Sequence, residues 1–135
     1  MLKFGSPVGQ NSSSISGDTT LNSSELARKI IELAEEKQAS AITLLDLREI
    51  SVLADYFVIC TSDSTRQTKA ILDSIASDLK KEDILPLRPP EGKPDAGWTL
   101  LDYGDVVVHV FNESTRQFYD LEQLWKDAQV VLKIQ

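Results

Sequence analysis

The sequence predicts an α/β (α+β) fold in which one mixed β-sheet is flanked by helices. Segments with helical spacing of apolar residues alternate along the chain with short runs rich in β-branched residues. Two of these runs, residues 56–61 and 106–111, are nearly continuous in apolar residues, which is typical of strands covered on both faces. The chain has 135 residues, of which 41% are hydrophobic and 26% are charged, and this composition suits one globular domain.

Residues 1–21 are expected to be a disordered tail, and residues 22–135 the folded domain. The tail is rich in Ser, Asn and Gly and carries a single basic residue, Lys3. It has neither the apolar core of a signal peptide nor the arginines of a transit peptide. We therefore expect a cytoplasmic protein, with an organelle stroma or matrix as the alternative if the tail is a transit segment. No apolar run approaches the ~20 residues that span a bilayer, so no membrane partner is expected.

The first half of the domain is expected to contain two helices and two strands. A capping-box pattern at residues 22–25 is followed by apolar residues at helical spacing, which predicts a helix over 23–37. Short apolar runs predict strands over 41–47 and 56–61. Apolar residues four positions apart then predict a second helix over 65–81.

The second half is expected to contain a hairpin and a last helix. Residues 84–87 are interpreted as a short edge strand, and the Pro- and Gly-rich residues 88–97 as a loop. Strands are expected over 98–103 and 106–111, around a Gly-Asp turn. The last helix should begin near Ser114. Its apolar residues at helical spacing, with Trp125 expected in the core, are Phe118, Leu121, Leu124, Trp125 and Ala128.

The residue types that carry catalysis are sparse. The single histidine, His109, and the single cysteine, Cys60, lie in apolar strand segments, and we interpret both as buried structural residues. A metal site usually needs three or four ligands, and the sequence contains neither a nucleophile elbow nor a phosphate-binding glycine loop. Asp102 and Asp105 flank a turn, where aspartates commonly cap backbone N–H groups; a metal role would need a further ligand such as Asp55. We therefore expect no catalytic residues, no metal and no cofactor.

The charge of the chain favours a protein partner over nucleic acid. The formal net charge is -7, from 21 acidic and 14 basic residues. An acidic chain is a poor binder of phosphate backbones, and we expect no direct recognition of nucleic-acid sequence. The same charge steers a protein towards basic protein surfaces, although it also serves solubility, and both interpretations stay open. Trp98 is likewise interpreted either as an interface anchor or as ordinary core.

Four segments of the chain resemble the ribosomal silencing factor family, also called Iojap-like proteins. They are DLREISVLADYFVICTS at 46–62, STRQTKAI at 64–71, WTLLDYGDVVVHVF at 98–111 and RQFYDLEQLW at 116–125. The segments follow one another in the family's order over about residues 22–130. The resemblance implies a mixed sheet with flanking helices, similar to that of nucleotidyltransferases.

The resemblance also implies a function. Members of the family bind the large ribosomal subunit through its ribosomal protein uL-fourteen, block association with the small subunit and repress translation. A role in assembly of the large subunit is the alternative. The resemblance implies a homodimer as well, although no sequence pattern here requires one.

A metal-dependent nucleotidyltransferase is the less favoured alternative. Those enzymes carry an Asp-x-Asp pair on a strand, which holds metal ions on one side of the sheet. This chain has no such pair, and its Asp120-Leu121-Glu122 falls in an expected helix, where residues i and i+2 do not face the same way. A fold similar to that of nucleotidyltransferases therefore does not by itself imply nucleotidyltransferase activity.

The segment WTLLDYGDVVVHVF is expected to contact the partner. We predict partner-binding roles for Trp98, Leu100, Asp102, Tyr103 and Asp105. Alternation along a strand places Trp98, Leu100 and Asp102 on one face. The roles expected for the group differ: the aromatic and aliphatic side chains supply apolar contact area, and Asp105 meets a basic residue of the partner.

Overall fold

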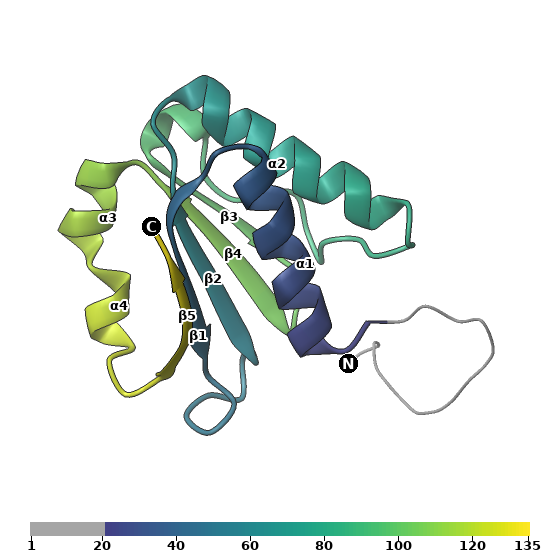
Figure 1. Ribbon diagram of the computed structural model, residues 1–135, viewed down its shortest axis with the longest axis vertical. Coiled ribbons are helices and arrows are strands. Elements are labelled where there is room, and N and C mark those ends of the chain that lie inside the picture. Colours follow the sequence, from purple (N-terminus) through teal and green to yellow (C-terminus); the bar gives the residue numbers. More distant parts are fainter. Residues whose placement is uncertain (1–20) are drawn as a thin grey trace.

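The computed structural model of the chain describes residues 21–135, so the predicted disordered tail at 1–21 lies outside the described residues except for its last one. A single five-stranded sheet carries helices on both faces (Figure 1). The helices are α1 (Ser23–Glu36), α2 (Thr65–Lys80), the short 3-10 helix η1 (Pro94–Ala96), α3 (Glu113–Tyr119) and α4 (Leu121–Leu124). None of the helices in this part of the chain has the length and apolar character needed to cross a membrane.

The sheet is mixed, as the sequence predicted. Its strands are β1 (Ser40–Asp46), β2 (Tyr56–Thr61), β3 (Trp98–Asp102), β4 (Val106–Phe111) and β5 (Gln129–Ile134). Their order across the sheet is β3-β4-β2-β1-β5. Strands β2 and β4 are parallel, and the other neighbouring pairs are antiparallel. The α+β prediction is therefore confirmed, including both strands of the expected hairpin.

Helices α1 and α2 cover one face of the sheet because each has one apolar stripe and a well-capped start. The Asn22 side chain accepts from the Glu25 backbone N–H at 2.8 Å, and the Glu25 carboxylate accepts from the Asn22 N–H at 3.0 Å, which completes the predicted capping box. At the start of α2 the Ser64 hydroxyl accepts from the Gln67 N–H at 3.0 Å, and the Gln67 side chain accepts from the Asp63 N–H. The buried side chains under these helices form the larger core: Leu26, Ala27, Ile30, Ile31, Leu33, Ala34, Ile42, Leu44, Tyr56, Val58, Cys60, Ile71, Leu72, Ile75, Leu79, Leu101, Tyr103, Val106, Val108 and Val110.

The opposite face of the sheet has a second, smaller core. A C-terminal arm, residues 113–128, carries α3 and α4 across this face, and Figure 1 shows it on the far side of the sheet from α1 and α2. The buried side chains of the smaller core are Leu45, Leu47, Ala54, Ile59, Val107, Phe111 and Leu121. Trp98, Leu100 and Trp125 pack against it while remaining half-buried.

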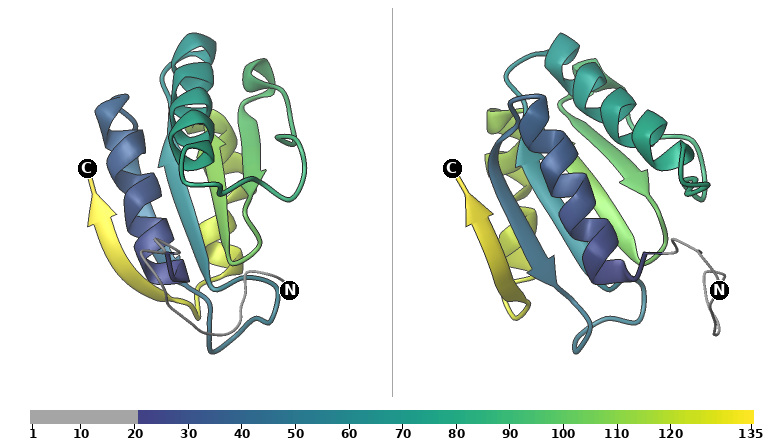
Figure 2. Two further views of the ribbon diagram at one scale, coloured as in Figure 1. Left: turned by 90° about the vertical axis from the view of Figure 1, so that its right-hand side faces the viewer. Right: turned by 45° about the vertical axis from the view of Figure 1, so that its right-hand side comes forward.

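The outer edge of β3 is covered by the segment that follows α2, which runs alongside it (Figure 2). The Leu87 N–H donates to the Asp102 carbonyl at 2.8 Å, and Glu91 and Leu100 exchange two backbone bonds of 2.9 Å. The predicted edge strand at 84–87 is wrong, because these residues form no strand. Pro86 has no N–H to donate to a ladder, and only isolated bonds join the segment to β3.

The expected single last helix is also wrong. Asp120 has a left-handed backbone, with φ 46°, and it separates α3 from the four-residue α4. The chain then returns as β5, which was not predicted and which pairs with β1. As a result Phe118 and Leu124, two of the apolar residues at helical spacing, are exposed, whereas Leu121 is buried and Trp125 packs edge-to-face on Phe57 at 5.5 Å.

Candidate functional site

Strand β3 presents three side chains to the face that α1 and α2 leave free. Trp98, Leu100 and Asp102 are half-buried, while the intervening Thr99 and Leu101 are buried against the other face. This alternation is the one expected from the sequence. We call Trp98, Leu100 and Asp102 the β3 face. The Tyr119 ring of the C-terminal arm contacts the Trp98 end of this face.

Trp98 is held rigidly at one end of this face. Its indole stacks on Phe111 with a centroid distance of 4.9 Å and lies 4.9 Å from the Tyr119 ring. Its Nε1–H donates to Nδ1 of His109 at 3.2 Å. A half-exposed tryptophan fixed in this way loses little side-chain entropy on binding, which is the physical condition for a strong interface anchor.

Tyr103 does not present its ring as expected. Its side chain is only 2% exposed and belongs to the larger core, and burial raises the pKa of its hydroxyl to about 12. The next residue, Gly104, has φ 88°, and the Tyr103 N–H donates to the Val106 carbonyl at 2.9 Å, so the turn closes with the ring pointing inwards. Tyr103 therefore stabilises the β3–β4 turn by packing its ring into the larger core, and its ring is not available for contact with a partner.

Asp102 is engaged within the chain. One carboxylate oxygen accepts from the Gly104 N–H at 2.8 Å, and the other accepts from Arg88 at 3.0 Å. The first bond is the backbone-capping role that aspartates commonly play in turns. The half-exposed Asp102 thus fixes the turn and places the Arg88 guanidinium beside the β3 face.

Asp105 lies at the opposite end of the hairpin from Trp98, next to Asp55. The Asp105 carbonyl accepts from the N–H groups of Asp55 and Tyr56 at 2.7 and 3.0 Å, which joins the β3–β4 turn to the start of β2. Burial, and the neighbouring Asp55 carboxylate, raise the pKa of the Asp105 carboxyl. Within residues 21–135 Asp105 forms no salt bridge. This end of the hairpin is therefore a site where a cation would be favourable.

Two exposed aromatic side chains beside Trp98 were missed by the sequence analysis. Phe118 is 80% exposed and Tyr119 is 49% exposed, and their rings pack edge-to-face at 5.0 Å. Tyr119 in turn contacts Trp98. The sequence pattern did not mark them as exposed, because consecutive residues of a helix can both face a core, as Ile30 and Ile31 of α1 do. The aromatic surface thus continues from β3 onto α3.

His109 and Cys60 are buried, as predicted. His109 is 3% exposed, and burial lowers its pKa to about 4, so the imidazole is neutral at pH 7. Cys60 is fully buried, and burial raises the pKa of its thiol to about 12, which leaves it unreactive. Within the described part of the chain no cluster of three or more His, Cys, Asp or Glu side chains is placed to hold a metal ion.

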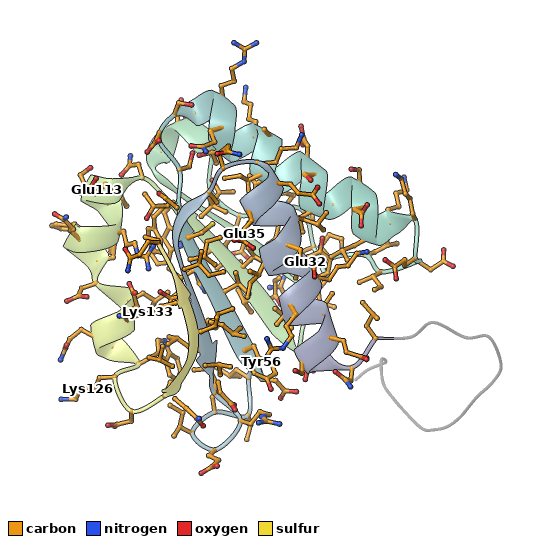
Figure 3. All side chains as sticks on the ribbon, viewed as in Figure 1. Glu32, Glu35, Tyr56, Glu113, Lys126 and Lys133 are labelled. Atoms are coloured by element: carbon orange, nitrogen blue, oxygen red, sulfur yellow. The ribbon has the colours of Figure 1, made fainter. Side chains whose placement is uncertain are left out.

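The residues of the Asp-x-Glu pattern on the arm have a structural role. Asp120 adopts the left-handed conformation between α3 and α4. Glu122 is held by Arg116 through bonds of 3.1 and 2.8 Å, and these bonds, with a smaller effect from Lys133, lower its pKa. Figure 3 shows Lys133 of β5 on the side of the sheet where the arm lies. The Glu122 carboxylate therefore neutralises cations of the chain itself.

Arg116 fastens the C-terminal arm to the sheet. Its guanidinium donates to the Ala41 carbonyl at 2.6 Å, to the Thr61 hydroxyl at 2.9 Å and to the Thr43 hydroxyl at 3.3 Å, in addition to Glu122. One side chain thus joins α3 to β1, β2 and α4. By fixing α3, Arg116 also fixes the aromatic residues that flank Trp98.

Known proteins share both the sequence and the architecture described above. A protein-family model described as "Ribosomal silencing factor during starvation" matches residues 20–135. The chain is similar to the ribosomal silencing factor RsfS of Bacillus subtilis, with 40% identity over 108 residues, which cover 80% of this chain and 91% of that protein. It is 39% identical to the RsfS of Halalkalibacterium halodurans over 114 residues, 82% of this chain and 94% of the relative.

A solved structure shares the fold. The crystal structure of a protein from Chromobacterium violaceum superimposes with a TM-score of 0.74 at 34% identity, covering 78% of this chain and 88% of the other. The likeness therefore extends over most of both chains.

Proposed function

The chain belongs to the ribosomal silencing factor family, and on this premise we propose that it binds the large ribosomal subunit through ribosomal protein fourteen and sterically blocks the small subunit. The membership confirms the family resemblance of the sequence. The chain is accordingly a ribosome-binding factor and not an enzyme.

The observation that carries the proposal is the rigid, half-exposed Trp98 at the end of the β3 face. Binding energy at protein interfaces concentrates in a few preorganised aromatic and arginine side chains. Trp98 meets this description, and Leu100 extends its apolar surface along the strand. Phe118 and Tyr119 extend the same surface onto α3. We assign the apolar centre of the interface to these four side chains.

Charge supports a basic partner surface around this centre. The chain carries a net charge of -7, which favours encounter with a positively charged protein surface. Asp105 has a raised pKa beside Asp55, so a basic side chain of the partner would relieve their repulsion. Asp102 contributes at the rim together with Arg88. Tyr103 contributes indirectly, since its buried ring holds the turn that presents Asp105.

The proposed mechanism requires only that the protein occupies a surface of the large subunit. If the β3 face binds the part of the large subunit that the small subunit must contact, the two subunits cannot join while the factor is bound. A standard interface of roughly 1,600 Å² in total is sufficient for a stable complex. Repression then depends on the residence time of the complex and on no chemical step.

A subunit-joining assay on sucrose gradients tests the proposal. Separated subunits are mixed with the protein and magnesium is raised; we expect co-sedimentation with the large subunit and a smaller joined peak. Trp98→Ala should weaken binding about 30-fold, because truncating a central tryptophan costs about 2 kcal/mol. Leu85→Ala, an exposed leucine outside the proposed surface, is the matched control.

Two other results would count against the proposal. If the protein neither sediments with the large subunit nor reduces the joined peak, the proposed function is wrong for this chain. If it binds through Trp98 but leaves joining unchanged, silencing is wrong, and the same surface serves assembly of the large subunit.

A further inference from the structure

We infer that His109 is a positioning residue of the binding face: by accepting the indole N–H of Trp98, it fixes the orientation in which Trp98 meets the partner. The inference rests on the proposed function, because it assigns a role within the same surface. His109 itself is buried and does not touch the partner. It acts on binding only through Trp98.

The strand pairing brings the two side chains together. In the antiparallel β3–β4 ladder His109 is paired with Leu100 and Phe111 with Trp98, so Trp98 and His109 are diagonal neighbours on one face. This places Nε1 of Trp98 3.2 Å from Nδ1 of His109. The bond therefore follows from the register of the hairpin and not from a flexible loop.

The chemistry of the two groups fixes the state of the histidine. An indole Nε1–H can only donate, so the Nδ1 that accepts it must be unprotonated, and the neutral imidazole must carry its proton on Nε2. Burial of His109 favours the neutral ring. The acceptor is thus available throughout the neutral pH range.

Aromatic neighbours hold the imidazole itself in place. The Phe57 ring packs edge-on at a centroid distance of 4.6 Å. The Phe111 ring is nearly parallel to the imidazole, at 12°, with a centroid distance of 6.3 Å. These two rings fix the plane of the imidazole, and within that plane Nδ1 lies on the side of the Trp98 N–H. The acceptor is therefore preorganised before any partner arrives.

The hydrogen bond restricts Trp98 in a way that stacking on Phe111 and the tilted contact with Tyr119 do not. Stacking fixes the plane of the Trp98 indole but tolerates a turn of the ring within that plane or a flip of it. The bond to His109 selects one orientation and satisfies the only polar atom of the ring, so the remaining exposed surface is carbon. Without an acceptor, a partner that covers Trp98 would bury an unpaired N–H, which is unfavourable.

A matched pair of substitutions separates positioning from packing. His109→Asn keeps an oxygen acceptor near the place of Nδ1, whereas His109→Leu has a similar volume and no acceptor. We expect His109→Leu to weaken binding to the large subunit about 10-fold. His109→Asn should restore most of the affinity. In a Trp98→Phe background, which lacks the donor, His109→Leu should cause no further loss.

Nuclear magnetic resonance reports the bond directly in the native chain. The protein has two tryptophans, so a ¹⁵N-labelled sample gives two indole N–H signals, and Trp98→Phe identifies one of them. We expect the Trp98 signal to exchange slowly with solvent in the native chain and in His109→Asn, and rapidly in His109→Leu. The single imidazole should show the tautomer with its proton on Nε2. The Trp125 indole is the internal reference.

The outcomes distinguish the inference from the proposed function. The inference is overturned if native protein and His109→Leu bind the large subunit equally well, or if the native imidazole carries its proton on Nδ1. If the native protein does not bind the subunit at all, the proposed function fails and the inference falls with it. The tautomer measurement needs no substitution, so it can overturn the inference even if a variant does not fold.

Discussion

The two faces of the sheet are closed in different ways. On one face, two helices of 14 and 16 residues lie over an extensive core whose side chains are almost all apolar. On the other, an arm with helices of seven and four residues covers a smaller core and is fastened by the bonds of Arg116. Trp98 and Leu100 stay half-exposed on this second face.

This difference separates stability from recognition. A large apolar core supplies most of the free energy of folding, and it can do so without exposing any functional group. A face that is only partly covered leaves aromatic surface for a partner, and its arm must then be held by directional polar bonds. We therefore expect substitutions on the two faces to affect different measurements.

The largest expected effect is on the stability of the larger core. Ile75→Ala should lower the free energy of unfolding by about 4 kcal/mol, because Ile75 is fully buried under α2 and its loss leaves a cavity. Leu121→Ala in the smaller core should cost about 2 kcal/mol. Urea unfolding measures both, with the exposed Asp73→Ala as control. Equal costs for the two core substitutions would contradict the proposed inequality of the faces.

The next largest effect is a pH dependence of stability, and it comes from His109, which lies on the sheet face with the smaller core. The unfolded chain binds a proton at His109 below pH 6.5, whereas burial lowers the pKa in the folded protein to about 4. Stability should therefore fall as the pH drops from 6.5 to 4, by up to about 3 kcal/mol, and show no such change above pH 7. Unfolding curves at several pH values measure this slope. His109→Leu should flatten it, and parallel curves for the two proteins would refute the assignment.

A smaller effect should follow from releasing the arm. Arg116→Met removes five hydrogen bonds made by a mostly buried guanidinium, to Ala41, Thr43, Thr61 and Glu122, and should cost about 2 kcal/mol. The same change should speed amide exchange in α3 and α4 more than in α1. Arg66→Met is a matched control. The tetrapeptide Ser-Thr-Arg-Gln occurs at residues 64–67 and 114–117, so Arg66 and Arg116 occupy the same position in it, but Arg66 is exposed. Similar losses from both variants would argue against a fastening role.

The smallest effect on stability is expected at the exposed aromatic pair. Phe118→Ser should change the free energy of unfolding by less than about 0.5 kcal/mol, because the ring is largely exposed. It should nevertheless weaken binding to the large subunit about threefold, since the ring extends the surface beside Trp98. Unaltered binding would restrict the interface to β3.

Local patterns predicted most of the fold. The capping box, the helical spacing and the apolar runs placed α1, α2, β2 and the hairpin within about one residue of their observed ends. These signals work because each element buries one face against the same sheet. Predicting Trp98, Leu100 and Asp102 on one face needed only the alternation of a strand.

The errors arose where distant contacts decide the structure. Strand β5 exists because it pairs with β1, far away in the sequence, and the left-handed Asp120 that ends α3 leaves no mark on the hydrophobic pattern. Tyr103 was expected at the surface because it lies beside a turn, yet the closure of that turn directs its ring into the larger core. Neither the β5–β1 pairing nor the packing of Tyr103 is determined by neighbouring residues in the sequence.

The strand order has a consequence for how the protein is made. Strand β1 is the first to leave the ribosome, and the partner that covers its outer edge, β5, is the last strand of the described chain. During synthesis β1 therefore has a free edge, able to pair with other chains, until residues 129–134 emerge. We therefore expect the nascent domain to complete its sheet only after residues 129–134 have left the ribosome.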